Sequence, residues 1–140
     1  QVQLRHVVFI ALGSRGDVQP LAILASKTAA SSPQLRVTLV THAELEHALR
    51  EGGADALLQE NVALRRLAVP CFMEAPRAPA QSAGTPWSGA PAQNLPCILD
   101  VGGQRRAEWI AAALHAKDAD VLVGNLFSMA VVYHLAERLG

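Results

Sequence analysis

LRHVVFIAL at residues 4–12 runs directly into GSRGDVQP at residues 13–20. The first segment is an apolar run rich in β-branched residues, continuous from Val7 to Leu12, which is typical of a strand buried on both faces of a parallel sheet. Gly13-Ser14-Arg15-Gly16 predicts a tight loop, and Asp17 is placed to cap the helix that follows. Pro20 falls in the first turn of that helix, where its missing N–H costs little. These residues therefore predict a strand, a tight loop and a helix in succession.

The next segments repeat the strand–helix alternation. Apolar residues recur at helical spacing to about Ala30, and Ser31-Ser32-Pro33 is expected to end the first helix. A second strand is predicted over residues 35–41, and a second helix from Ala43 to Glu51, ending at Gly52-Gly53. This order predicts an α/β fold with a parallel, Rossmann-like sheet.

The second half of the chain gives a weaker pattern at first. Residues 62–69 predict a strand, and residues 70–97, rich in Pro, Ala, Ser and Gly, predict a long irregular loop that is either functional or a flexible linker. A helix is then predicted over 107–116 with Trp109, Ile110 and Ala113 facing inward, followed by a strand over 120–125 and a helix over 129–139. Because another strand should follow in such a sheet, the chain looks truncated at Gly140.

The composition restricts the classes of partner. Of the 140 residues, 51% are hydrophobic, which suits one domain with a packed core. Lys and Arg together number 12, as do Asp and Glu, so the formal net charge is +0. A nucleic-acid partner would require a basic surplus to offset phosphate charge, so we expect none.

The cysteines and the apolar runs bear on the cellular compartment. Cys71 and Cys97 form no CxxC pair, so no metal site is expected. Two free thiols in a cytoplasmic protein are expected, and a disulfide is the alternative. No stretch approaches the roughly 20 apolar residues that a membrane-spanning helix needs.

The loop at residues 13–16 follows the carboxyl end of a strand, where open α/β sheets bind ligands. Its glycines permit close approach of a ligand to the backbone, and the next helix presents free N–H groups and the positive end of its dipole. A polar ligand, an anion especially, is therefore expected. The loop lacks the Gly-Lys-Ser/Thr ending of a P-loop, and its Gly-x-x-Gly spacing differs from the G-x-G-x-x-G dinucleotide motif.

After a buried first strand, GSRGDVQP resembles the N-terminal signature of family 28 glycosyltransferases, which include sterol glucosyltransferases and enzymes that glycosylate macrolide and glycopeptide antibiotics. THAELE at residues 41–46 is similar to the family's segment after the second strand, and residues 119–125 and 136–140 fit a later strand and helix. The resemblance covers residues 4–50 well and 100–140 loosely. One departure is Ser32-Pro33-Gln34, where the family usually has a Gly-His pair before its second strand.

The resemblance implies a GT-B enzyme, of which residues 1–140 would be the N-terminal, acceptor-side half. The family's C-terminal donor-binding domain has no counterpart in these residues, so the 140 residues alone are expected to be inactive. The implied activity is inverting transfer of a hexosyl group, with UDP-glucose as the expected donor, to a hydroxyl of a sterol, another lipid or a small molecule. The nucleotide sugar would be a co-substrate, so no cofactor is implied, and any membrane contact would be peripheral.

An alcohol is a poor nucleophile, so a base should take the proton of the acceptor hydroxyl. Asp17 matches the acidic residue of the family motif that has this role in some members, and its alternative role is to cap the first helix. The candidate substrate-binding residues are Gly13, Ser14, Arg15, Gly16, His42 and Asn125. Structural roles stay open for several of them: turn formation for Ser14, an ion pair for Arg15 and a helix start for His42, which is also an alternative base.

Two other functions stay open. One is a non-catalytic acceptor-binding or scaffold half that needs a separate donor-binding chain. The other is a generic nucleotide-binding α/β protein. GSRGDVQP disfavours the latter, as does the lack of an acidic residue at the end of the second strand, where Thr41-His42 stands.

Overall fold

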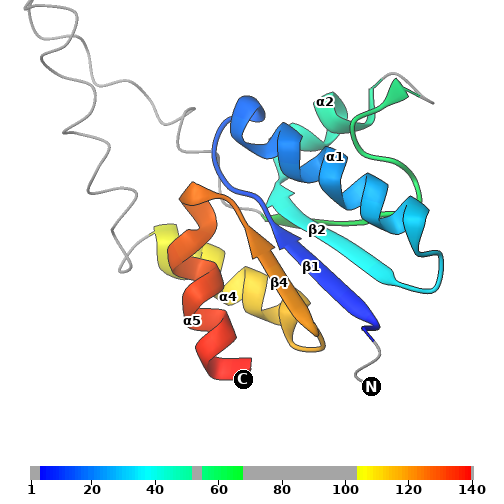
Figure 1. Ribbon diagram of the computed structural model, residues 1–140. Helices are drawn as coiled ribbons and strands as arrows, with labels where there is room; N and C mark the ends of the chain where they lie inside the picture. Colours follow the sequence, from blue (N-terminus) through cyan, green and yellow to red (C-terminus); the bar gives the residue numbers. More distant parts are fainter. Residues whose placement is uncertain (1–3, 52–54, 68–103, 140) are drawn as a thin grey trace, which may run out of the picture.

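The computed structural model describes residues 4–51, 55–67 and 104–139 (Figure 1). Across these ranges, four parallel strands form one sheet in the order β3-β2-β1-β4. The strands are β1 (His6–Ile10), β2 (Arg36–His42), β3 (Ala63–Leu67) and β4 (Val121–Gly124). The strand order reverses between β1 and β4, and open α/β sheets bind ligands at such a switch point, outside the carboxyl ends of the strands.

Helices cover both faces of this sheet (Figure 1). One face is covered by α1 (Arg15–Ser31) and by the short α2 (Glu46–Arg50), which continues the 3₁₀ turn η1 (Ala43–Leu45). The other face is covered by α4 (Gln104–Ala116) and α5 (Met129–Leu139), the latter preceded by the 3₁₀ turn η3 (Leu126–Ser128). These three layers confirm the Rossmann-like α/β class predicted from the sequence.

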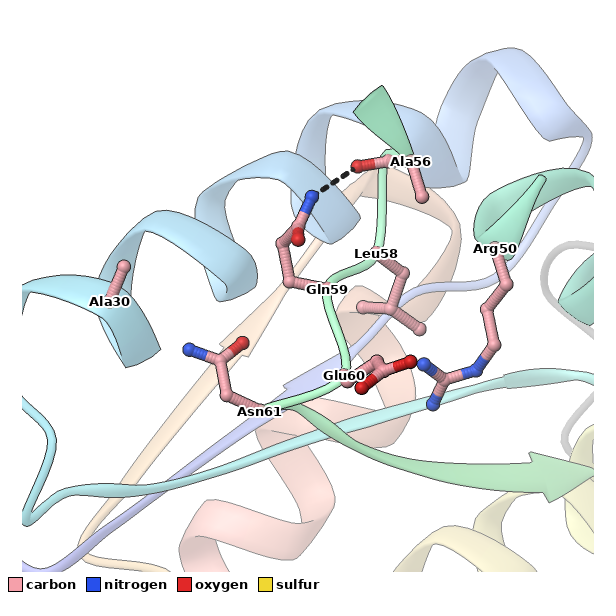
Figure 2. A pocket seen from close by; sticks show the side chains of 7 residues that line it. All are labelled: Ala30, Arg50, Ala56, Leu58, Gln59, Glu60 and Asn61. Atoms are coloured by element: carbon pink, nitrogen blue, oxygen red, sulfur yellow. Dashed lines mark hydrogen bonds between the residues drawn. The ribbon is translucent and has the colours of Figure 1, made fainter. Parts of the chain in front are cut away.

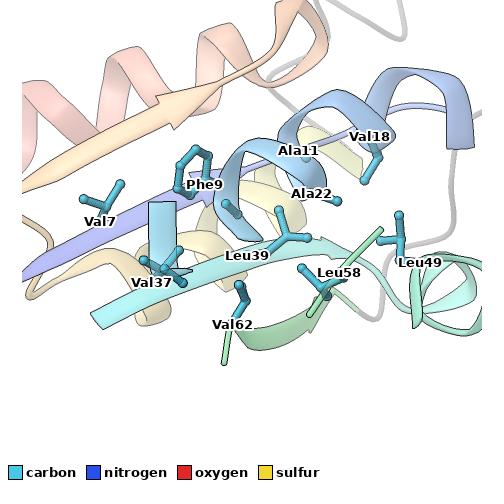
Figure 3. Packing of buried hydrophobic residues seen from close by; sticks show 12 residues of the cluster. Val7, Phe9, Ala11, Val18, Ala22, Val37, Leu39, Leu49, Leu58 and Val62 are labelled. Atoms are coloured by element: carbon cyan, nitrogen blue, oxygen red, sulfur yellow. The ribbon is translucent and has the colours of Figure 1, made fainter. Parts of the chain in front are cut away.

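The apolar run of β1 contributes to two separate cores, because successive side chains of a strand point to opposite faces. Alternate residues pack under α1, as Figure 3 shows for Val7, Phe9 and Ala11. The residues between them, Val8, Ile10 and Leu12, pack under α4 and α5. Helix α1 meets the sheet through a row of small side chains, and its Ala22 and Ala25 are fully buried. This explains why residues 7–12 are apolar at every position.

The predicted element boundaries agree closely with the structure. Helix α1 ends one residue beyond the predicted Ala30, and α5 spans the predicted residues 129–139. Strand β3 begins one residue after the predicted Val62, and the predicted strand residues 68–69 lie outside the described ranges. Helix α4 begins three residues before the predicted 107. The predicted loop at 70–97, both cysteines and the Gly52-Gly53 helix end lie outside the described residues.

Asp17 caps the first helix from its third helical position and is not itself the N-cap residue, because Ser14 has the extended N-cap conformation and α1 begins at Arg15. One prediction about a side chain of α4 was wrong. Ile110 does not face inward but is 46% exposed. Helix α4 instead buries Ala112 and Ala116, whose small side chains let the helix lie close to the sheet. The side chain of Trp109 is not among those described.

A polar cluster lies at the amino edge of the sheet, opposite the switch point. The buried His6 places its Nε2 2.9 Å from Thr38 Oγ1 and its Nδ1 2.8 Å from Arg36 Nη2. The Asp118 carbonyl oxygen lies 3.2 Å from the same Nδ1. Burial lowers the pKa of His6 from its usual 6.5, and the positive charge of Arg36 acts in the same direction. The neutral imidazole is therefore the form that fits the fold.

Within the described parts of the chain, no helix is both long enough and apolar enough to cross a bilayer. In the same ranges, no three His, Cys, Asp or Glu side chains gather in an arrangement that could hold a metal ion.

Candidate functional site

Three segments that follow strands meet at the carboxyl edge of the sheet. In the parallel register, Ile10 of β1 pairs with Val40 of β2 and with Gly124 of β4. The loop at residues 13–17, His42 and Asn125 therefore come together, although they are far apart in the sequence. The sequence-predicted site residues share one edge of the sheet, beside the switch point.

Asp17 and Ser14 are linked at the start of α1. The backbone N–H of Ser14 donates to Asp17 Oδ2 at 2.8 Å, and the Ser14 hydroxyl donates to the same oxygen at 2.6 Å. Ser14 is the N-cap and Asp17 the third helical residue, which is the arrangement of a capping box. Among the described residues, these are the two hydrogen bonds of the Asp17 carboxylate, and both use Oδ2. The half-buried Asp17 thus has its second oxygen, Oδ1, available for a ligand.

Gly13 makes room for this carboxylate. Its φ of +114° belongs to a region that side-chain-bearing residues rarely adopt. A Cβ at this position would lie 2.8 Å from Asp17 Oδ2 and 3.0 Å from Cδ2 of Phe127. The carboxylate and the aromatic ring therefore pack directly over the bare Cα of Gly13.

His42 holds the loop from the β2 side. It is the last residue of β2 and is fully buried. Its Nε2 accepts the backbone N–H of Gly13 at 3.4 Å. An imidazole nitrogen that accepts this bond is poorly placed to take a proton from a substrate, so the geometry disfavours His42 as the alternative base.

Asn125 holds the loop from the β4 side. Its Nδ2 donates to the carbonyl oxygens of Leu12, at 2.6 Å, and of Asp17, at 3.2 Å. The side chain therefore binds the backbone at both ends of the loop, one bond on each side of Gly13. The sequence predicted Asn125 as a substrate ligand, whereas the structure gives its amide a set of backbone partners.

Arg15 and Gly16 lie in the exposed first turn of α1. No acidic side chain in the described ranges forms an ion pair with Arg15. A Cβ at Gly16 would have Ser14 Oγ as its nearest neighbour at 3.8 Å, an ordinary contact, so packing does not require a glycine here. These two residues form the solvent-facing side of the loop.

The electrostatics of the site differ from those expected of a phosphate-binding loop. The sequence predicted an anion at the start of α1, but the carboxylate of Asp17 already lies in the first turn of the helix. Like charges repel, so a second anion is disfavoured beside this carboxylate, while the hydroxyl of a neutral ligand can donate to it. The arrangement therefore suits a hydroxyl-bearing ligand and a base that removes its proton.

Two residues of this edge were missed by the sequence analysis. Ser128 is fully buried, and its hydroxyl oxygen accepts the N–H of Asn125 at 2.9 Å. The Asn-x-x-Ser spacing after a strand is a helix-start signal that could have identified this pair. The contact of Phe127 with Gly13 has no comparable signal, because it joins segments more than a hundred residues apart.

A cleft elsewhere on the described surface contains none of these residues. Its volume is about 740 Å³, and Figure 2 shows the lining side chains from the end of α1, from α2 and from the connection to β3. Polar groups in it already bind the protein: Arg50 Nη2 donates to the Val62 carbonyl at 3.4 Å, and Gln59 Nε2 to the Ala56 carbonyl at 2.8 Å. The switch-point edge is therefore the stronger candidate for a chemical site.

Comparison with solved structures finds a similar fold in CalG4, the calicheamicin glycosyltransferase, with a TM-score of 0.61 and 22% sequence identity. No protein-family profile matches the chain, and no curated protein sequence matches it significantly. The structural match covers 98% of this chain and 30% of the CalG4 chain, so this chain spans less than a third of that structure. The likeness shows that the strands and helices described above are arranged as in part of a glycosyltransferase.

Proposed function

We propose that this chain forms the acceptor side of a glycosyltransferase, which transfers a hexosyl group from a nucleotide sugar to a hydroxyl group with inversion. The observation that carries the proposal is the placement of Asp17. Its carboxylate lies at the switch point of a sheet whose fold is similar to part of a glycosyltransferase, with one oxygen bonded to Ser14. The resemblance of GSRGDVQP to family 28 glycosyltransferases supports the same activity.

In the proposed reaction, Asp17 is the general base. The Ser14 bonds hold Oδ2, and Oδ1 accepts the proton of the acceptor hydroxyl as its oxygen attacks the anomeric carbon of the donor. The bond from the anomeric carbon to the nucleotide diphosphate breaks, and the diphosphate leaves with the bonding electron pair. Because the carboxylate of Asp17 already lies at the start of α1, we assign the cations or N–H donors that stabilise the leaving diphosphate to a donor-binding domain.

The acceptor is proposed to be a sterol, another lipid or a small apolar alcohol, with UDP-glucose as donor. Two large apolar side chains follow Asn125 at the same edge of the sheet, Leu126 and Met129, and they are 70% and 60% exposed. Exposed apolar area at this edge of the sheet favours an apolar acceptor over a free sugar. Contact with a membrane would then be peripheral.

The test is glucosyl transfer from labelled UDP-glucose to a panel of sterols and polyphenols by the full-length gene product. We expect Asp17→Asn to lower the rate by about 10²–10⁴-fold, the usual contribution of a general base. The asparagine oxygen can still accept the Ser14 N–H, so the variant should fold. Asp55→Asn, at an exposed residue remote from the loop, is the matched control and should keep full activity.

The scaffold function makes the opposite prediction. If the protein only binds an acceptor and recruits a separate donor-binding chain, the purified full-length protein transfers no sugar. Equal rates in Asp17→Asn and wild type would leave Asp17 as a helix-capping residue and refute its role as base.

A further inference from the structure

The amide of Asn125 uses its whole hydrogen-bonding capacity within the protein. A primary amide has two N–H donors and an oxygen with two lone pairs. Nδ2 donates to the carbonyl oxygens of Leu12 and Asp17 at 2.6 and 3.2 Å. Oδ1 accepts the backbone N–H of Ser128 at 3.0 Å and that of Leu12 at 3.4 Å. Nothing in this set is left for a substrate.

The chemistry of these partners determines the orientation of the amide. The carbonyl oxygens of Leu12 and Asp17 can only accept, and the N–H groups of Leu12 and Ser128 can only donate. Exchanging the amide oxygen and nitrogen would turn all four contacts into mismatches. The side chain is therefore locked as a bridge between the start of η3 and both ends of the Gly13 loop.

We infer that Asn125 is a positioning residue for the base Asp17, rather than a ligand of the substrate. This inference rests on the glycosyl transfer proposed above. The bond to the Asp17 carbonyl holds the backbone of the base, while Ser14 holds its carboxylate, so the two contacts together set where Oδ1 lies relative to β4. A shift of about 1 Å in a reacting group can lower a rate by about 10²-fold, so losing this bridge should affect the chemical step.

Two substitutions separate this role from helix capping. Asn125→Asp and Asn125→Ser both retain an oxygen that can accept the Ser128 N–H, so the start of η3 and α5 stays capped. Both lack the Nδ2 donors to Leu12 and Asp17. The serine variant is neutral, so a shared effect of the two variants cannot come from an added negative charge near Asp17.

Ser26→Ala is the matched control for a general loss of stability. Ser26 is also buried and also bridges two segments, since its hydroxyl donates to the Leu57 carbonyl at 3.1 Å and accepts the Gln59 N–H at 3.0 Å. This bridge ties α1 to the connection before β3 and contributes nothing to the candidate site. Its loss should lower the melting temperature and leave transfer unchanged.

The measurements are kcat and acceptor KM of the full-length protein, together with amide hydrogen exchange of residues 13–17. We expect both Asn125 variants to lose about 10- to 100-fold in kcat, with acceptor KM changed less than about threefold. Exchange in residues 13–17 should accelerate by at least about tenfold in these variants and stay at the wild-type rate in Ser26→Ala.

If the Asn125 variants have the same kcat as Ser26→Ala, the inference is overturned and Asn125 is a capping residue. If they only raise the acceptor KM and leave kcat unchanged, the inference is also overturned and Asn125 binds the substrate. The exchange measurement needs no activity. If the wild-type protein transfers sugar to no acceptor, the proposed function fails, and unchanged exchange in the Asn125 variants then overturns the positioning role separately.

Discussion

Replacing Gly13 with alanine should destabilise the protein far more than the same change at Gly16, three residues away. At Gly13 the backbone has a φ of +114°, and an added Cβ would lie 2.8 Å from Asp17 Oδ2 and 3.0 Å from the ring of Phe127. At Gly16 the nearest neighbour of a Cβ would be Ser14 Oγ, at 3.8 Å. The two positions belong to one loop but differ in both backbone strain and space.

The expected magnitude follows from these two terms. A non-glycine residue in a rarely populated backbone region costs about 1–3 kcal/mol. Overpacking against atoms that cannot move freely typically costs another 1–3 kcal/mol, partly relieved if the carboxylate shifts. We therefore expect Gly13→Ala to lower the free energy of unfolding by about 3 kcal/mol. Gly16→Ala, in the first turn of a helix, should be neutral or stabilise by up to about 1 kcal/mol.

Urea unfolding followed by far-ultraviolet circular dichroism measures both effects. If the free energy of unfolding decreases by about 2 kcal/mol per molar urea, the unfolding midpoint of Gly13→Ala should be about 1.5 M lower than that of wild type. Transfer activity should fall with it, because the new methyl group displaces the Asp17 carboxylate. A midpoint within about 0.3 M of wild type, or an equal fall in Gly16→Ala, would refute the packing of the carboxylate over Gly13.

Two further predictions concern the rest of the fold. Folding lowers the pKa of His6 below 6.5, so the unfolded chain binds a proton at this residue more readily than the folded protein does. The free energy of unfolding should therefore decrease as the pH falls from 6.5 toward the folded-state pKa. The urea midpoint of His6→Gln should consequently fall less than that of wild type between about pH 7.5 and 5.5, and parallel curves would contradict this. Ala22→Leu should lower the free energy of unfolding by about 1–3 kcal/mol, because the fully buried Ala22 lies where α1 meets the sheet. Thermal unfolding measures this effect, and an unchanged melting temperature would contradict the packing.

The sequence predicted the strands and helices well because their signals are local. The run at residues 4–12 and the helical spacing after Asp17 each lie within one element, and the order of elements then implies the parallel sheet. On α4, Ala113 does pack against the core, whereas the predicted inward position of Ile110 was wrong, because the pattern gave no reason to prefer Ala112 over the larger Ile110 as the buried side chain. Burial there depends on how closely the helix approaches the sheet, which is a tertiary property.

The candidate site was predictable in its residues but not in their contacts. The loop at residues 13–16 and the residues that end β2 and β4 could be identified from the order of elements. That Asn125 binds Leu12, 113 positions away, depends on the register of β1 with β4, and no local pattern encodes it. For the same reason the sequence left both a substrate-binding and a structural role open for His42 and Asn125, and the bonds that favour the structural roles could not be predicted.

The packing of the Asp17 carboxylate over Gly13 distinguishes this loop from phosphate-binding loops. In a phosphate-binding loop, glycines let an external anion approach the backbone at the helix start. Here the space over Gly13 is filled by the carboxylate of Asp17, held there by Ser14. A phosphate could replace it only if Asp17 moved away or became neutral, and a displaced or neutral Asp17 could not act as a base. Binding of the donor phosphate to the N–H groups of this helix start and base catalysis by Asp17 therefore exclude each other, so the proposed mechanism requires other groups to bind the donor phosphates.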